Sequence, residues 1–293
     1  MAMRPMLRSL LVLAVVGLAA GCRAAPDHVD PWPETPPPPE GEAPVLAVAP
    51  LVIDYRPTAP QPPAPNGFRN VLDAKLIRGL LVARLEASGH FARVTPVGED
   101  ANVLHEARWA SPPREDPAAE APEDPAAEGV EDPQEPAAAP EEPPEVRARR
   151  AFIEQARAAG ASLVAELRIN SARIKYEERN GLFPLSFALW YLFIFPGWMI
   201  RDETYSGNVD VDVYLFDVET GAIRARERLK IAVRRDFNDF DRGFWYILDI
   251  LRAPDCLDAE DWLMIADWLR KPVAHRVAGD ATLWITRTNA ARD

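Results

Sequence analysis

Residues 209–233 carry the sequence VDVDVYLFDVETGAIRARERLKIAV, in which apolar and polar residues alternate along two runs. Because successive side chains of a strand point to opposite faces, this alternation predicts a half-buried β-hairpin. The residues between the two runs, Asp217–Gly221, are expected to form the turn. The apolar residues of both strands lie on one face of the sheet only if the residue numbers of each facing pair add up to an even number. We expect the two numbers of each facing pair to add up to about 440.

The polar face of this hairpin is a row of opposite charges. The expected register places Asp210 opposite Lys230 and Asp212 opposite Arg228. Opposite charges at facing positions stabilise a strand pair. The row is therefore interpreted as a solvated, self-neutralising face, and a ligand-binding face is the alternative.

Five elements upstream of the hairpin predict a layered core. The apolar run Val45–Ile53 is typical of a strand buried on both faces. Apolar residues at helical spacing over 72–85 predict a helix, with Asn66 as a possible N-cap and Gly89 as the stop. A strand at 91–97, a helix at 147–159 and a strand starting at 161–169 follow. This order predicts an α/β (α+β) fold: a single layered domain with a mixed sheet flanked by helices.

The C-terminal region, residues 241–293, is expected to add helices to this domain. Apolar residues within 244–251 predict one short helix. Asp258 can cap a second helix, whose apolar stripe continues to Leu269. Pro272 is expected to end that helix, because proline lacks the N–H that a helix interior requires.

The N-terminus resembles an export signal that ends in a lipidation site. Residues 1–9 include Arg4 and Arg8 but no acid, and an apolar run follows. The run ends in Leu-Ala-Ala-Gly-Cys, which resembles the lipobox of bacterial lipoproteins. We predict that residues 1–21 are removed and that Cys22 receives a diacylglycerol and an acyl chain, with no other cofactor. An ordinary signal peptide with an incidental cysteine is the alternative.

Composition divides the rest of the chain into segments. Proline is concentrated before the first strand, acidic residues form one block, and one apolar run interrupts the second half of the domain. The predicted segments are a proline-rich tether (22–43), the first half of the α/β domain (44–110), an acidic insertion (111–146), the second half of the domain (147–240) with a hydrophobic insertion (182–200), and a C-terminal helical region (241–293).

The acidic insertion accounts for most of the net charge of −12, because residues 111–146 hold twelve acidic residues against one arginine. The sequence EDPAAE at 115–120 recurs at 123–128, and large apolar residues are almost absent. Such a composition predicts disorder. It is interpreted as a tolerated insertion or as an acidic arm that binds a basic partner. No basic patch is evident elsewhere, so nucleic acid is not an expected partner.

The segment 182–200 is nineteen residues long, contains no charge and is rich in aromatic residues. Three interpretations are open: a transmembrane helix interrupted by Pro184 and Pro196, an element buried in the domain's own core, or a loop that contacts a membrane or a partner. The third interpretation names as contact residues Phe183, Phe187, Trp190, Tyr191, Phe193, Phe195 and Trp198.

The sequence offers no support for catalysis. It contains no HExxH, GxSxG, P-loop or GxGxxG motif. The stretch Asp236–Asp241 resembles a fragment of a calcium loop, but Phe240 stands where a ligand is needed. We therefore predict no catalytic residue, no metal site and no enzymatic activity.

Four motifs follow one another along the domain: VLAVAPL at 45–51, GHFARV at 89–94, GASLVAELRI at 160–169, and the hairpin at 209–223. Their order resembles the periplasmic lipoprotein superfamily that includes the curli-secretion lipoprotein CsgG and the N-terminal domain of TolB. The resemblance implies envelope assembly, secretion or accessory binding, and no catalysis. The curli pore carries a membrane-spanning hairpin in the interval of residues 182–200. That run lacks the alternation of a pore hairpin here, so a pore is not expected.

These observations together predict a non-catalytic lipoprotein of the bacterial cell envelope. Arg23, rather than Asp, follows Cys22. By resemblance to enterobacterial sorting this favours the outer membrane, with the domain facing the periplasm, and the inner membrane is the alternative. The expected partners are the membrane, through the lipid, and an unidentified envelope protein or a second copy. The alternative function is a solute- or glycan-binding lipoprotein, which would need a concave pocket.

Overall fold

A computed structural model describes residues 35–38, 40–53, 72–98, 144–193, 197–242 and 259–291. The predicted lipidation site Cys22, most of the acidic insertion, the expected cap Asn66 and the expected helix at 244–251 lie outside these ranges. The described elements are β1 (Val45–Val48), β2 (Val52–Ile53), α3 (Ala74–Ala87), β3 (Arg93–Pro96), α5 (Pro144–Ala158), β4 (Leu163–Arg179), α6 (Phe183–Phe193), η1 (Gly197–Met199), β5 (Glu203–Asp217), β6 (Ile223–Phe237) and α7 (Ala259–Ala290).

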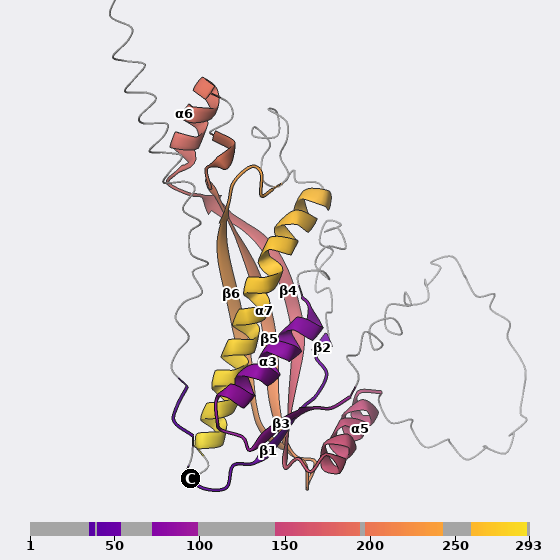
Figure 1. The fold of residues 1–293 in the computed structure, drawn as a ribbon. Coiled ribbons are helices and arrows are strands. Elements are labelled where there is room, and N and C mark those ends of the chain that lie inside the picture. The colour runs from indigo at the N-terminus through magenta and orange to yellow at the C-terminus, as the bar shows by residue number, and fades with distance from the viewer. Residues whose placement is uncertain are drawn as a thin grey trace, which may run out of the picture.

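The described strands form one mixed sheet in the order β3-β1-β4-β5-β6, with β2 also paired to β4. Strands β1, β2, β3 and β4 pair in parallel, whereas β4, β5 and β6 pair antiparallel. Helices α3 and α7 cover one face of the sheet, and α5 covers part of the other face (Figure 1). The predicted α/β fold with a mixed, helix-flanked sheet is therefore confirmed.

The predicted register of the β5–β6 hairpin is also confirmed. Asp210 faces Lys230 and Asp212 faces Arg228. The side chain of Asp217 accepts hydrogen bonds from the backbone N–H and the hydroxyl of Thr220, which closes the turn. The ion pairs run diagonally rather than directly across: Arg228 Nη2 lies 2.9 Å from Asp210.

Several boundaries differ from the sequence prediction, and two of the differences have a clear physical reason. The strand expected over 45–53 is divided into β1 and β2 around Pro50, which has no N–H to donate to the ladder. Helix α3 begins at Ala74, and its N-cap is Asp73 rather than Asn66, because the Asp73 carboxylate accepts a hydrogen bond from the N–H of Leu76.

The prediction that Pro272 ends the second C-terminal helix is wrong, since α7 continues through Pro272 for 32 residues in all. Proline at 272 leaves the carbonyl of Trp268, four residues earlier, without its helical donor. The guanidinium of Arg235 on β6 donates a hydrogen bond to that carbonyl at 3.2 Å. Val273 and Val277, which follow the proline, are completely buried against the sheet and hold the helix in place.

Arg235 should therefore stabilise α7 through Trp268, and a double-mutant cycle can measure this. We expect Arg235→Ala to lower the free energy of unfolding by about 1 kcal/mol. In a Pro272→Ala background, where the new N–H satisfies the carbonyl, the same substitution should cost less. Urea denaturation checks both values, and Arg234→Ala, from the opposite face of β6, is the control. Equal costs in the two backgrounds would contradict this account.

Candidate functional site

The hydrophobic insertion forms the elements α6 and η1, which connect β4 to β5 beyond the end of the sheet (Figure 1). Strand pairing continues as far as Arg179 opposite Glu203. The side chain of Asn180 accepts a hydrogen bond from the N–H of Leu182, and its amide donates to the carbonyl of Arg201. One asparagine thus joins both ends of the insertion where it leaves the strands. The insertion is consequently carried on the tip of two long, paired strands.

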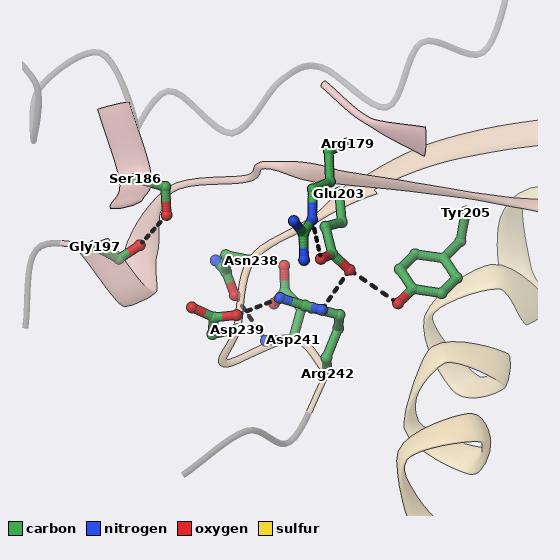
Figure 2. A network of polar contacts seen from close by, with 9 residues as sticks. All are labelled: Arg179, Ser186, Gly197, Glu203, Tyr205, Asn238, Asp239, Asp241 and Arg242. Atoms are coloured by element: carbon green, nitrogen blue, oxygen red, sulfur yellow. Dashed lines mark hydrogen bonds and ion pairs between the residues drawn. The ribbon is translucent and has the colours of Figure 1, made fainter. Parts of the chain in front are cut away.

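Helix α6 packs closely against η1 through Gly197. A Cβ atom at this position would lie 2.7 Å from the Cβ of Trp190, so no larger residue fits without movement. The buried hydroxyl of Ser186 donates a hydrogen bond to the carbonyl of Gly197 at 3.2 Å (Figure 2). These contacts define one compact unit, which we call the α6–η1 cap, comprising the described residues 182–193 and 197–200.

The cap exposes large apolar side chains to solvent. Helix α6 turns once every 3.6 residues, so the exposed side chains occupy about half of its circumference. Their exposed fractions are Leu182 49%, Leu185 45%, Phe187 46%, Tyr191 76% and Leu192 57%. Soluble monomers seldom expose such a contiguous apolar surface without a binding role.

The predicted contact residues divide into two groups. Phe187 and Tyr191 are exposed, whereas Phe183, Trp190 and Trp198 are half-buried. The guanidinium of Arg179 lies 4.2 Å from the ring centroid of Phe183, and the Trp198 ring packs edge-on against Phe240. The side chain of Phe193 and all of Phe195 lie outside the described structure. Leu182, Leu185 and Leu192, which the sequence analysis did not name, belong to the exposed group.

Helix α6 has 11 residues, and the 3-10 helix η1 is a separate element. Within the described ranges, no helix combines the length and the apolar character needed to cross a membrane.

A buried ion-pair cluster lies beneath the cap. The guanidinium of Arg242 donates to the carboxylates of Glu203 and Asp239, and all three side chains are buried (Figure 2). Glu203 also accepts a hydrogen bond from the Tyr205 hydroxyl at 3.2 Å and lies 3.6 Å from Arg179. The cluster joins the start of β5 to the residues that follow β6, immediately below the point where the cap begins.

The cluster contains more acid than base. Asp202, Glu203 and Asp239 are buried around Arg242. Burial raises the pKa of Asp239 to about 7 and the pKa of Asp202 to about 6, although Arg242 partly opposes both shifts. Burial alone would lower the pKa of Arg242, but Glu203 and Asp239 raise it above its ordinary value. Asp239 and Asp202 therefore bind a proton more readily than exposed aspartates do.

Sequence analysis did not identify this cluster. The sequence did contain one indication of it. Glu203 is an even number of residues from Tyr205 and Val209, which face the core, so its side chain lies on the same buried face of β5. In the segment that resembles a calcium loop, Asp239 forms an ion pair with Arg242, and Asp241 forms one with Arg201. Among the described residues, no three histidine, cysteine or acidic side chains are grouped to hold a metal ion.

Comparison with known proteins gives no assignment. No protein family matches the chain, and no characterised protein matches its sequence. Among solved structures, the chain is similar to the hypothetical protein CT253 from Chlamydia trachomatis, at 13% identity over 86% of this chain and 100% of that one, with a TM-score of 0.35. It is also similar to the lipoprotein GNA1162 from Neisseria meningitidis, at 10% identity over 66% and 83%, with a TM-score of 0.30. The LpoB C-terminal domain from Salmonella enterica gives 14% identity over 66% and 87%, with a TM-score of 0.27. Similarities this low carry no argument about function.

The cluster predicts an unusual dependence of stability on pH. Between the ordinary pKa of 3.8 and the value of about 7 for Asp239, the folded protein binds more protons than the unfolded chain. Stability should therefore fall as the pH rises through this window. Urea denaturation at a series of pH values should give a shallower fall for Asp239→Asn than for the parent protein.

Asp267→Asn is the control for this series, because Asp267 is exposed on α7 and lies outside the cluster. It should leave the slope unchanged. Identical slopes for Asp239→Asn and the parent protein would show that Asp239 does not titrate in this range.

Proposed function

We propose that this protein is a non-catalytic lipoprotein of the bacterial envelope that is anchored through Cys22 and acts by presenting the α6–η1 cap to a membrane or to a partner. The observation that carries the proposal is the exposed apolar surface of α6, which is held at the tip of the paired strands β4 and β5. The N-terminal sequence that ends in Leu-Ala-Ala-Gly-Cys supports the lipid anchor and export from the cytoplasm.

The chemistry of the cap suits an interfacial role. Tyr191 is the most exposed of its apolar side chains, at 76%. Tyrosine and tryptophan are enriched where a membrane meets water, because each combines an apolar ring with a polar group. The guanidinium of Arg179, which lies on the Phe183 ring and 3.6 Å from Glu203, supports the cap from its base.

The scaffold suits binding rather than catalysis. Beneath the cap, Arg242 donates to Glu203 and Asp239, and the Tyr205 hydroxyl donates to Glu203, so these buried polar groups are engaged with one another. The sequence contains none of the catalytic motifs considered above. A rigid support that positions an apolar surface is sufficient for an assembly or accessory role.

Membrane contact by the cap can be tested with the non-lipidated chain, residues 23–293. We expect it to float with liposomes of phosphatidylethanolamine and phosphatidylglycerol. The double variant Leu185→Gln/Leu192→Gln should reduce the bound fraction at least about tenfold, because both side chains lose their transfer into lipid. Its melting temperature should match that of the parent, since both residues are about half exposed.

The matched control is Val146→Gln/Ile223→Gln, which changes two exposed aliphatic residues far from α6 and should leave flotation unchanged. Loss of flotation in both double variants would indicate non-specific adsorption. A chain that never floats and melts earlier when α6 is altered would place α6 among the stabilising elements instead.

Lipidation predicts a second result in cells. Cys22→Ala should remove the protein from the membrane fraction after a high-salt wash, because the covalent acyl chains supply most of the membrane affinity. Mass spectrometry of the wild-type N-terminal peptide should give the mass of a lipid-modified cysteine. An unmodified N-terminus beginning after Ala25 would instead identify an ordinary signal peptide.

A further inference from the structure

The α6–η1 cap and the tether leave opposite ends of the domain, and α7 connects the two ends. Near the last residues of α7, the Asn289 side chain donates to the carbonyl of His90 at 3.4 Å. The ring of His90, which is fully buried, donates from Nε2 to the carbonyl of Pro36 in the tether at 2.8 Å. The tether is thereby held at the C-terminal end of α7.

The cap lies at the other end of the same helix. Trp262, in the first turn of α7, packs edge-on against Tyr205, which in turn donates to Glu203 at the base of the cap. Helix α7 has 32 residues and is therefore about 48 Å long. Figure 1 shows α6 beyond the upper end of the sheet and the C-terminal end of α7 at the lower end.

Among the described residues, most of the exposed large apolar side chains lie at the cap end, and Val146 and Ile223 are the exceptions. Leu263, Met264 and Trp268 are exposed on the first turns of α7, near the level where the cap begins. The flanks of the domain are charged, with the Asp210–Arg228 pair on the open sheet face and the Arg276–Asp280 pair on α7. A lipid surface would therefore be contacted end-on, with the long axis of the domain standing away from it.

The tether limits where Cys22 can lie. Fourteen peptide units separate Cys22 from Pro36, and a fully extended chain of this length spans at most about 50 Å. The cap lies beyond the far end of an α7 that is itself about 48 Å long. An end-on cap could therefore reach the membrane that holds Cys22 only if the tether were stretched to its limit along the whole domain.

The occupant that best fits the cap is lipid. A protein groove covers one stripe of a helix, whose anchors recur every three or four residues. The exposed side chains of α6 instead extend over about half of its circumference, which suits a continuous apolar medium. We propose that the cap docks onto a second lipid bilayer, so that the protein bridges two membranes. This inference rests on the proposed lipid anchor and on the proposed membrane contact of the cap.

Bridging can be measured with the lipidated full-length protein. The protein is purified from bacterial membranes and reconstituted into immobilised liposomes of phosphatidylethanolamine and phosphatidylglycerol. Fluorescent, protein-free liposomes of the same composition are then added. We expect the immobilised liposomes to capture them, and Leu185→Gln/Leu192→Gln to reduce capture at least about tenfold. Val146→Gln/Ile223→Gln should capture as the parent does.

A second readout separates this inference from the proposed function. Tyr191→Cys, in a Cys256→Ser background, carries an environment-sensitive dye on the cap. A blue shift of the dye that requires the added liposomes supports bridging. The same shift without added liposomes and without capture would place the cap in the anchoring membrane, which overturns bridging but retains the proposed membrane contact. No shift and no capture would overturn both.

Discussion

The structure depends on the pairing of β4 along both of its edges. One edge is paired in parallel with β1 and β2, and the other is paired antiparallel with β5 over its whole length. The parallel side places β4 in the covered core, where both faces are buried. The antiparallel side extends beyond that core and carries the insertion. Without this central strand, the α6–η1 cap would have no rigid connection to the domain.

The extension of β4 creates a problem that the buried cluster resolves. Near the strand tips, the buried side chains of Glu203, Asp239 and Arg242 take the place of apolar core residues. Arg242, which follows β6, is joined to the start of β5 through Glu203 and to its own segment through Asp239. Burying these charges has a large desolvation cost, so such pairs contribute more to a defined geometry than to stability. Burial, with a smaller contribution from the neighbouring carboxylates Asp202 and Glu203, raises the pKa of Asp239.

Local alternation made part of the fold predictable. The β5–β6 register follows from apolar parity and facing charges, both of which are visible within 25 residues of sequence. The length of β4 was not predictable in this way. A bulge between Ile169 and Ser171 shifts the alternation by one residue, so that even-numbered instead of odd-numbered side chains face the α7 side beyond it. Before the bulge Ile169 faces the α7 side, and after it Ala172 and Ile174 do so.

Interactions between distant segments account for what the sequence did not reveal. Pro272 normally ends a helix, and the donor that compensates for it comes from Arg235 on another element. The partners in the ion cluster, Glu203 and Arg242, are 39 positions apart. For the cap, composition identified the aromatic segment as a candidate surface. Which side chains face outward depended on the close contact between Gly197 and Trp190, a geometric detail that composition does not encode.

The parallel pairing of β1 with β4 has a mechanical consequence. A pull on the tether draws β1 toward one end of the domain, and a pull on α6 draws β4 toward the other. The hydrogen bonds between the two strands lie across the direction of pull, so all of them are loaded together in shear instead of opening one at a time. The domain is therefore built to resist extension along its long axis, and its lifetime under load would be governed by the rate of unfolding.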